Sequence, residues 1–204
     1  MIFSESLKGI LIMRLTKIVT SFLSAIFLMS TISVSSANEF TPQITAYADE
    51  VSSWLSDPAI VSAIEAQNTA NAGLTQGDID ALDKTWRAET SSADQPLIKE
   101  VLGREISKFL SGKVDASGGL ITEAFVMDNK GLNVGQSGIT SDYWQGDEGK
   151  WQNTYSKGVG AVDIGDVELD ESTQTYQSQL SITIVNGSGA PIGAITLGLN
   201  VELL

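Results

Sequence analysis

The chain has 204 residues and a formal net charge of −13, and it contains neither cysteine nor histidine. The length suits one domain after a leader, with enough residues to bury a core without disulfides. The acidity argues against nucleic acid and anionic membrane surfaces as partners, because both require basic patches. Without histidine and cysteine, Ser-His-Asp chemistry, a thiol nucleophile and most transition-metal sites are excluded. We expect a non-catalytic protein without a cofactor.

Residues 1–37 predict a secretory signal peptide. Basic residues precede an apolar run over residues 18–34, and the small residues Ser-Ser-Ala follow it. This order predicts cleavage near Ala37 and a periplasmic or secreted product. An uncleaved membrane anchor is the alternative, since the apolar run has about the shortest length that spans a bilayer. Met1 and Met13 are both candidate start residues.

Residues 38–117 carry the apolar periodicity of helices, and we assign them to a helical N-terminal part of the domain. The pair Asp57-Pro58 is typical of a helix start, because aspartate caps and proline fits the first helical position. The apolar stripe runs on both sides of this pair, so the sequence leaves one kinked helix or two helices open. Trp54 and Trp86 are expected in the core.

Two further helices are predicted before the composition changes. Thr75 and Asp78 have the spacing of a capping box, which predicts a helix from that point. A last helix is expected to open near Pro96 and to end at Gly112, since glycine often follows a helix C-terminus.

Residues 118–204 predict an antiparallel sheet. We expect strands at residues 120–127, 132–136, 159–169, 177–185 and 192–201. The segment 177–185 alternates strictly between apolar and polar residues, which predicts one core face and one polar face. In the last strand, alternate positions hold only small or polar residues, which leaves room for a packed element or a ligand. Helices followed by strands favour an α+β fold.

Three stretches, in this order, resemble the extracytoplasmic Cache family, also called PDC sensor domains. They are residues 123–131 (Glu-Ala-Phe-Val-Met-Asp-Asn-Lys-Gly), the insert Asp142-Tyr-Trp to Trp151, and residues 190–195 (Ala-Pro-Ile-Gly-Ala-Ile). The resemblance implies N-terminal helices packed on a five-stranded antiparallel PAS-like sheet. It also implies a small-molecule pocket between the sheet and an insert at residues 137–158. Family members usually continue into a kinase, cyclase or chemotaxis module. This sequence stops at its last predicted strand instead, and we therefore expect a free-standing sensor module.

The insert combines aromatic rings with carboxylates, a combination that suits an ammonium group. The predicted ligand-binding residues are Tyr143, Trp144, Asp147, Glu148, Trp151, Tyr155, Lys157 and Asp163. The alternative is that the tryptophans fill the core and that the acidic residues are solvated. Calcium is a further option because the carboxylates are hard oxygen donors, although their spacing matches no EF-hand loop.

Two hypotheses of function follow. The first is a periplasmic, non-catalytic sensor module that binds an amino acid or amine and signals through a partner, such as a membrane receptor or sensor kinase. The second is a structural or protein-interaction domain whose pocket is filled by its own side chains. The second hypothesis predicts a homodimer through the N-terminal helix.

Overall fold

The computed structural model describes residues 38–170 and 174–204. The predicted signal peptide, with its cleavage near Ala37, lies outside the described residues. In the two described ranges, none of the helices combines the length and the hydropathy that a bilayer-spanning segment needs.

Five helices precede the sheet: α1 Thr41–Leu55, α2 Pro58–Ala70, α3 Gln76–Glu89, α4 Pro96–Gly103 and α5 Glu105–Ala116. The apolar stripe around Asp57 therefore belongs to two separate helices. The Asp57 side chain accepts a hydrogen bond from the Ala59 amide at 2.8 Å and so caps α2. The predicted capping box of α3 is also present, because Thr75 and Asp78 bond each other's backbone amides.

The prediction that Gly112 ends the last helix is wrong. Gly112 lies inside α5, and the helix break falls earlier, between α4 and α5 at Arg104. Tertiary packing tolerates the interior glycine because Ile106 and Leu110 of the same helix are buried in the main core. The helix ends at Ala116, just before Gly118, whose φ of 64° is left-handed.

The sheet has the strand order β2-β1-β5-β4-β3, and every neighbouring pair is antiparallel. The strands are β1 Ile121–Met127, β2 Asn133–Gln136, β3 Val162–Asp170, β4 Thr175–Val185 and β5 Pro191–Asn200. Between β2 and β3, the insert contains the short helix α6 Gly149–Gln152 and a 3-10 turn at Tyr155–Lys157. The predicted α+β class, with helices before a five-stranded antiparallel sheet, is confirmed.

The turn from β1 to β2 follows the predicted pattern. Asp128 is fully buried, and its carboxylate accepts hydrogen bonds from the amides of Lys130 and Leu132 at 2.8 and 2.9 Å. Gly131 closes the turn with a φ of 82°. In β3, the register shifts between Ile164 and Val167, which places the predicted bulge at Gly165.

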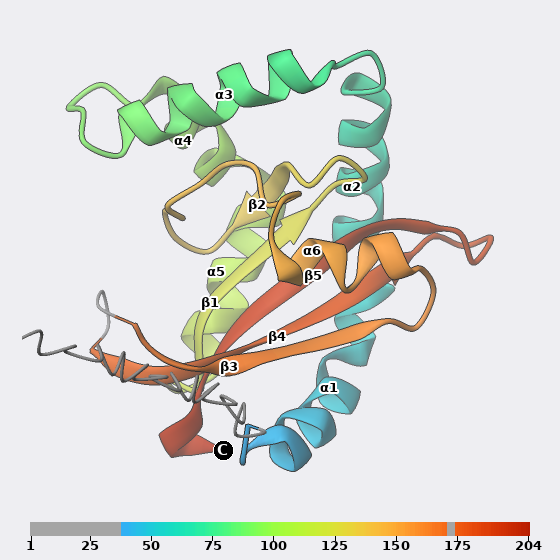
Figure 1. The fold of residues 1–204 in the computed structure, drawn as a ribbon, viewed down its shortest axis with the longest axis vertical. Coiled ribbons are helices and arrows are strands. Elements are labelled where there is room, and N and C mark those ends of the chain that lie inside the picture. The colour runs from blue at the N-terminus through green and yellow to red at the C-terminus, as the bar shows by residue number, and fades with distance from the viewer. Residues whose placement is uncertain (1–37, 171–173) are drawn as a thin grey trace, which may run out of the picture. The chain divides into compact units, whose positions relative to one another are not determined.

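The two faces of the sheet differ, as the alternation in 177–185 predicts. On one face Leu180, Ile182 and Ile184 join the main core with α1, α2 and α5. The other face carries polar and small residues together with Phe125 and Met127, and it lies against the insert. Figure 1 shows α6 in front of the sheet, whereas α2 and α5 pass behind it. This division places the main core behind the sheet and leaves the front face for a site.

Helices α3 and α4 belong to a second, smaller core. Its buried side chains are Ile79, Trp86, Ile98, Val101, Leu132 and Tyr143. Tyr143 comes from the insert and Leu132 directly precedes β2, so this cluster joins α3 and α4 to one end of the sheet. In Figure 1 the two helices lie at the top, beyond β2.

Candidate functional site

A pocket of about 600 Å³ lies on the front face of the sheet. Residues of β1 and β4 form its floor, and residues 137–150 of the insert form its rim and one wall. The pocket exists because the chain leaves β2 at Gln136 and returns to the sheet only at Val162.

Glu123, Gln177 and Gln179 form the polar floor. The Glu123 carboxylate accepts a hydrogen bond from Gln179 Nε2 at 2.9 Å and a longer one from Gln177 Nε2 at 3.5 Å. Gly198 of β5 lies between these strands, where a Cβ would come within 2.7 Å of Glu123 Cγ and 2.6 Å of Gln177 Oε1. The missing side chain at residue 198 therefore makes room for this cluster.

Lys150 of α6 supplies the positive charge of the pocket. Its side chain is 17% exposed, and its Nζ lies 2.8 Å from Glu148 Oε2. The same Nζ lies 3.3 Å from Gln145 Oε1 and 5.4 Å from the centre of the Phe125 ring. These contacts hold the ammonium group over the floor, where it can meet an acceptor on a ligand.

The rim consists of Ser137, Thr140, Ser141 and Gln145, all short or uncharged polar residues. Backbone contacts fix two of them. The Ser137 hydroxyl accepts a hydrogen bond from the Ala124 backbone amide at 2.9 Å, and the Gln145 backbone amide donates to the Gly131 carbonyl at 2.7 Å. The rim is thus attached to β1 and to the β1–β2 turn.

Among the described residues, the charged ones that line the pocket are Glu123, Asp170 and Lys150. The Lys150 ammonium already has Glu148 as a partner, whereas the Glu123 carboxylate is held by the neutral side-chain amides of Gln177 and Gln179. The balance is negative, which favours a ligand that carries a positive group. The lining amides and hydroxyls can donate and accept hydrogen bonds, so they suit a polar molecule.

None of the eight predicted ligand-binding residues lines this pocket. Tyr143 is 4% exposed and stacks on Trp86, with ring centroids 5.3 Å apart. Trp144 packs on the same small core, and its indole N–H donates to the Lys130 carbonyl at 2.7 Å. The Tyr143 ring is turned toward α3, whereas the Trp144 ring lies against the β1–β2 turn and Gly146. This placement agrees with the alternative in which the aromatic residues of the insert are structural.

Trp151 and Tyr155 belong to the insert, and they pack on Phe125 and Met127 of the sheet. Their ring centroids are 5.1 Å apart, and the Trp151 indole donates to the Asp128 carbonyl at 3.1 Å. Burial is the largest cause of a raised pKa at both Tyr155 and Tyr143. Both phenols are therefore neutral at pH 7. The two rings of the insert close the sheet face beside the pocket.

The predicted charged residues are dispersed over the insert and β3. Asp147 and Lys157 are exposed, Glu148 pairs with Lys150, and Asp163 accepts a hydrogen bond from Asn153 at 3.1 Å. In the described ranges no three acidic side chains gather to hold a metal ion. The calcium option thus has no ligand cluster there, and a ligand-binding role for the eight residues stays a prediction.

The sequence analysis missed Glu123, Gln177 and Gln179 as site residues. A signal was present: glutamines occupy the outward positions of the alternating strand 177–185, on the face predicted to be polar. Glu123 gave none, because a single acidic residue in an apolar strand does not show what it faces.

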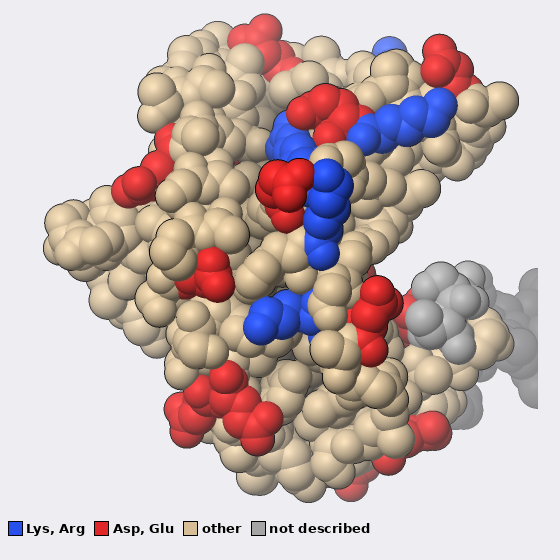
Figure 2. Space-filling model, turned by 180° about the vertical axis from the view of Figure 1, so that it is seen from behind, with Lys and Arg blue, Asp and Glu red and all other residues tan. Residues whose placement is uncertain are grey.

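A second pocket of about 450 Å³ lies between α2 and the start of α5. Four alanines of α2 form one wall, and Arg104 lies at its edge. The Arg104 guanidinium already donates to Gln67, to the Val134 carbonyl and to Glu100. The polar groups of this groove are therefore occupied within the protein, and the front pocket is the better candidate site. Figure 2 shows the opposite side of the molecule from Figure 1, where acidic and basic side chains are intermixed.

No family model and no curated protein matches the chain. Solved structures do match. The sensor domain of the V. cholerae histidine kinase DctB is 11% identical, with a TM-score of 0.42 over 80% of this chain and 52% of that one. The ligand-binding domain of the Campylobacter jejuni chemoreceptor Tlp3 with L-valine is 12% identical, with a TM-score of 0.38 over 82% and 66%. The chain therefore spans between half and two thirds of these two structures.

The sensor domain of E. coli DcuS also matches, at 18% identity and a TM-score of 0.37 over 61% of this chain and 92% of that one. All three are described as sensor or ligand-binding domains, which is the class of domain that the sequence resemblance indicated. At these identities the likeness is one of fold.

Proposed function

We propose that this protein is a non-catalytic, extracytoplasmic sensor module that binds a small zwitterionic or cationic molecule, an amino acid or amine, in the front pocket. One observation carries the proposal: a carboxylate, Glu123, lies in a pocket lined by amides and hydroxyls, with the ammonium group of Lys150 on the wall. The ligand-bound state then acts on a partner, such as a membrane receptor or sensor kinase.

The chemistry of the pocket supports this class of ligand. An amino group can form a charge-assisted hydrogen bond with Glu123, and a ligand carboxylate can accept one from Lys150. Lysine binds a carboxylate as a point charge rather than as a fork. Purely anionic ligands are disfavoured because Glu123 and Asp170 would repel them. The volume of about 600 Å³ is in the range of small-molecule sites.

A thermal-shift screen of the twenty amino acids, putrescine and small organic acids tests the proposal. A ligand at a hundred times its Kd stabilises a protein by about 2.7 kcal/mol, which raises the Tm by several degrees. For each compound that shifts the Tm, calorimetry compares the wild type with Glu123→Gln. We expect the variant to bind about tenfold more weakly or worse, the typical loss for a hydrogen bond to a charged group.

Glu65→Gln is the matched control, because Glu65 is an exposed residue of α2, on the other side of the sheet. It removes the same charge and should leave the affinity unchanged. Two results would contradict the proposal. One is a panel in which no amino acid or amine shifts the Tm; the other is a ligand that binds the wild type and Glu123→Gln equally.

The second candidate function is a structural or interaction domain, and the packing of Trp151 and Tyr155 on Phe125 and Met127 favours it. In that case the insert serves as a plug, and a homodimer through α1 would carry the function. Light scattering of the purified protein distinguishes the two candidates, since only the second requires a stable dimer in the absence of any ligand.

A further inference from the structure

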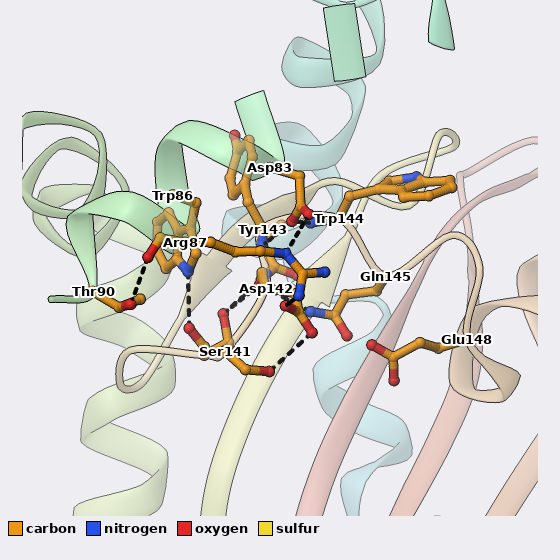
Figure 3. A network of polar contacts seen from close by, with 12 residues as sticks. Asp83, Trp86, Arg87, Thr90, Ser141, Asp142, Tyr143, Trp144, Gln145 and Glu148 are labelled. Atoms are coloured by element: carbon orange, nitrogen blue, oxygen red, sulfur yellow. Dashed lines mark hydrogen bonds and ion pairs between the residues drawn. The ribbon is translucent and has the colours of Figure 1, made fainter. Parts of the chain in front are cut away.

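We propose that Asp83 and Arg87 of α3 are positioning residues for the pocket rim, so that ligand binding is coupled to the attachment of α3. The inference rests on the proposed function of the same pocket. It concerns residues 140–144, which lead from the rim into the small aromatic core. Figure 3 shows the side chains of α3 directed at this segment.

The carboxylate of Asp83 holds two consecutive amides of the insert. Its Oδ1 accepts hydrogen bonds from the Tyr143 and Trp144 amides at 2.9 and 3.1 Å. Its Oδ2 accepts the Arg87 Nε–H at 2.7 Å. Asp83 is only 8% exposed, so its three donors replace most of its hydration. A buried carboxylate with this set of donors fixes the orientation of both peptide groups.

Two further contacts join α3 to the same segment. Arg87 Nη1 lies 2.6 Å from Asp142 Oδ1, so the guanidinium bridges Asp83 and Asp142. The Trp86 indole donates to the Thr140 carbonyl at 2.8 Å, and the Trp86 ring is fully buried. Three residues of one helix, Asp83, Trp86 and Arg87, thus hold the insert at residues 140, 142, 143 and 144.

The pocket uses the residues between and beside these attachment points. Thr140, Ser141 and Gln145 line the pocket. The side-chain amide of Gln145 donates to the Asp142 carbonyl at 3.0 Å, and the Thr140 hydroxyl donates to the same carbonyl at 2.7 Å. The carbonyl of Asp142 therefore connects the rim side chains to the residue that Arg87 holds. A shift of α3 changes the rim, and a shift of the rim changes the contacts of α3.

Helix α3 can respond to such a shift because its buried apolar residues, Ile79 and Trp86, belong to the small core and not to the main one. The coupling is reciprocal by thermodynamic necessity. A ligand that favours one rim geometry also favours the matching α3 position, and loosening α3 lowers the affinity for the ligand. The outer surface of α3 and α4 is then the part of the molecule that reports on the pocket.

Amide hydrogen exchange of the unliganded protein tests the positioning directly. In Arg87→Met, we expect the amides of Tyr143 and Trp144 to exchange several-fold faster than in the wild type, because local opening of the insert becomes easier. Asp83→Asn should give a larger increase at the same two amides. Lys84→Met is the matched control, since Lys84 is exposed on the same helix. Equal exchange in Arg87→Met and the wild type would overturn the inference.

Calorimetry with L-lysine, L-glutamine and putrescine tests the coupling. A titrant that binds the wild type should bind Arg87→Met and Asp142→Asn about threefold to tenfold more weakly, which is within the range by which single residues change the coupling between two sites. The double variant should lose no more than either single one, because the residues act as a pair. The Tm without ligand should fall in Arg87→Met, because the variant leaves the largely buried carboxylates of Asp83 and Asp142 without their shared charged partner.

The two arms fail for different reasons. If none of the three titrants nor any compound of the larger panel binds the wild type, the proposed function is wrong, and exchange alone decides whether the pair positions the rim. If a titrant binds the wild type and Arg87→Met equally well, the pocket is a binding site but its coupling to α3 is disproved.

Discussion

Gly198 shows how one residue without a side chain can shape a site. It lies on β5, between the strands that carry Glu123 and Gln177, and those two side chains occupy the space over it. Any larger residue there would push the floor of the pocket outward. The pattern of small residues in the last strand therefore serves the packing of polar side chains, which in turn form the floor of the pocket.

At the residue scale, substitution by alanine should change the free energy of unfolding in opposite directions at two glycines. At Gly131, φ is 82° and a Cβ would lie 2.5 Å from Gly146 Cα, so we expect Gly131→Ala to lower the free energy of unfolding by about 1–3 kcal/mol. At Gly112, inside α5, a Cβ meets nothing within 4 Å, so Gly112→Ala should stabilise by about 0.5–1 kcal/mol. Urea denaturation measures both. Equal effects of the two substitutions would contradict the assigned backbone geometry.

At the scale of elements, α3 depends on its N-terminal cap. Its buried apolar side chains, Ile79 and Trp86, pack in the small core. The Asp78 carboxylate accepts hydrogen bonds from the Thr75 amide at 2.9 Å and the Thr75 hydroxyl at 2.7 Å. The cap therefore helps to define where the helix that holds the rim begins.

Thr75→Ala should destabilise the protein by about 1 kcal/mol, the usual cost of removing a threonine cap. The hydrogen bonds from Thr75 hold the pKa of Asp78 below its ordinary value. A lowered pKa in the folded state contributes stability above the ordinary pKa of the carboxyl, and this contribution is lost as the pH falls through the lowered value. The difference between wild type and variant should therefore shrink in acid. Urea titrations at pH 7 and pH 3 measure it, and a constant difference would contradict this role.

At the scale of the molecule, the two largest hydrophobic clusters in the described part of the chain lie in different places. The larger one lies behind the sheet, under α1, α2 and α5, whereas the smaller one joins α3 and α4 to the insert. The pocket lies on the other face of the sheet, and its rim is attached to the smaller cluster. This arrangement places a less extensively packed unit beside the candidate site.

We expect the smaller unit to open without global unfolding. Amides of residues 83–87 in α3 should exchange with a lower opening free energy than those of residues 195–199 in β5, which lie at the centre of the sheet between β1 and β4. Native-state hydrogen exchange over a series of low urea concentrations measures both free energies. If the two sets of amides exchange with the same free energy and urea dependence, the chain opens as one unit and α3 has no independent motion.

The sequence by itself determined the class of fold and most of the elements. Helix caps at Asp57 and Thr75, strict alternation in 177–185 and the Asp128–Gly131 turn are local signals, because they depend on residues within a few positions of one another. Where packing overrides a local signal, the prediction failed: Gly112 is a plausible helix end by sequence, but burial of the residues before it continues the helix.

Only the tertiary structure decided which residues form the pocket. Glu123 and Gln179 are 56 positions apart, and they meet because β5 inserts between β1 and β4. The chemistry of the aromatic residues Tyr143 and Trp144 suits a ligand, and the fold also gives them partners within the protein, Trp86 of α3 and the Lys130 carbonyl. Which surface buries an aromatic ring depends on where the helices lie in the fold, and the sequence next to the ring does not determine that placement.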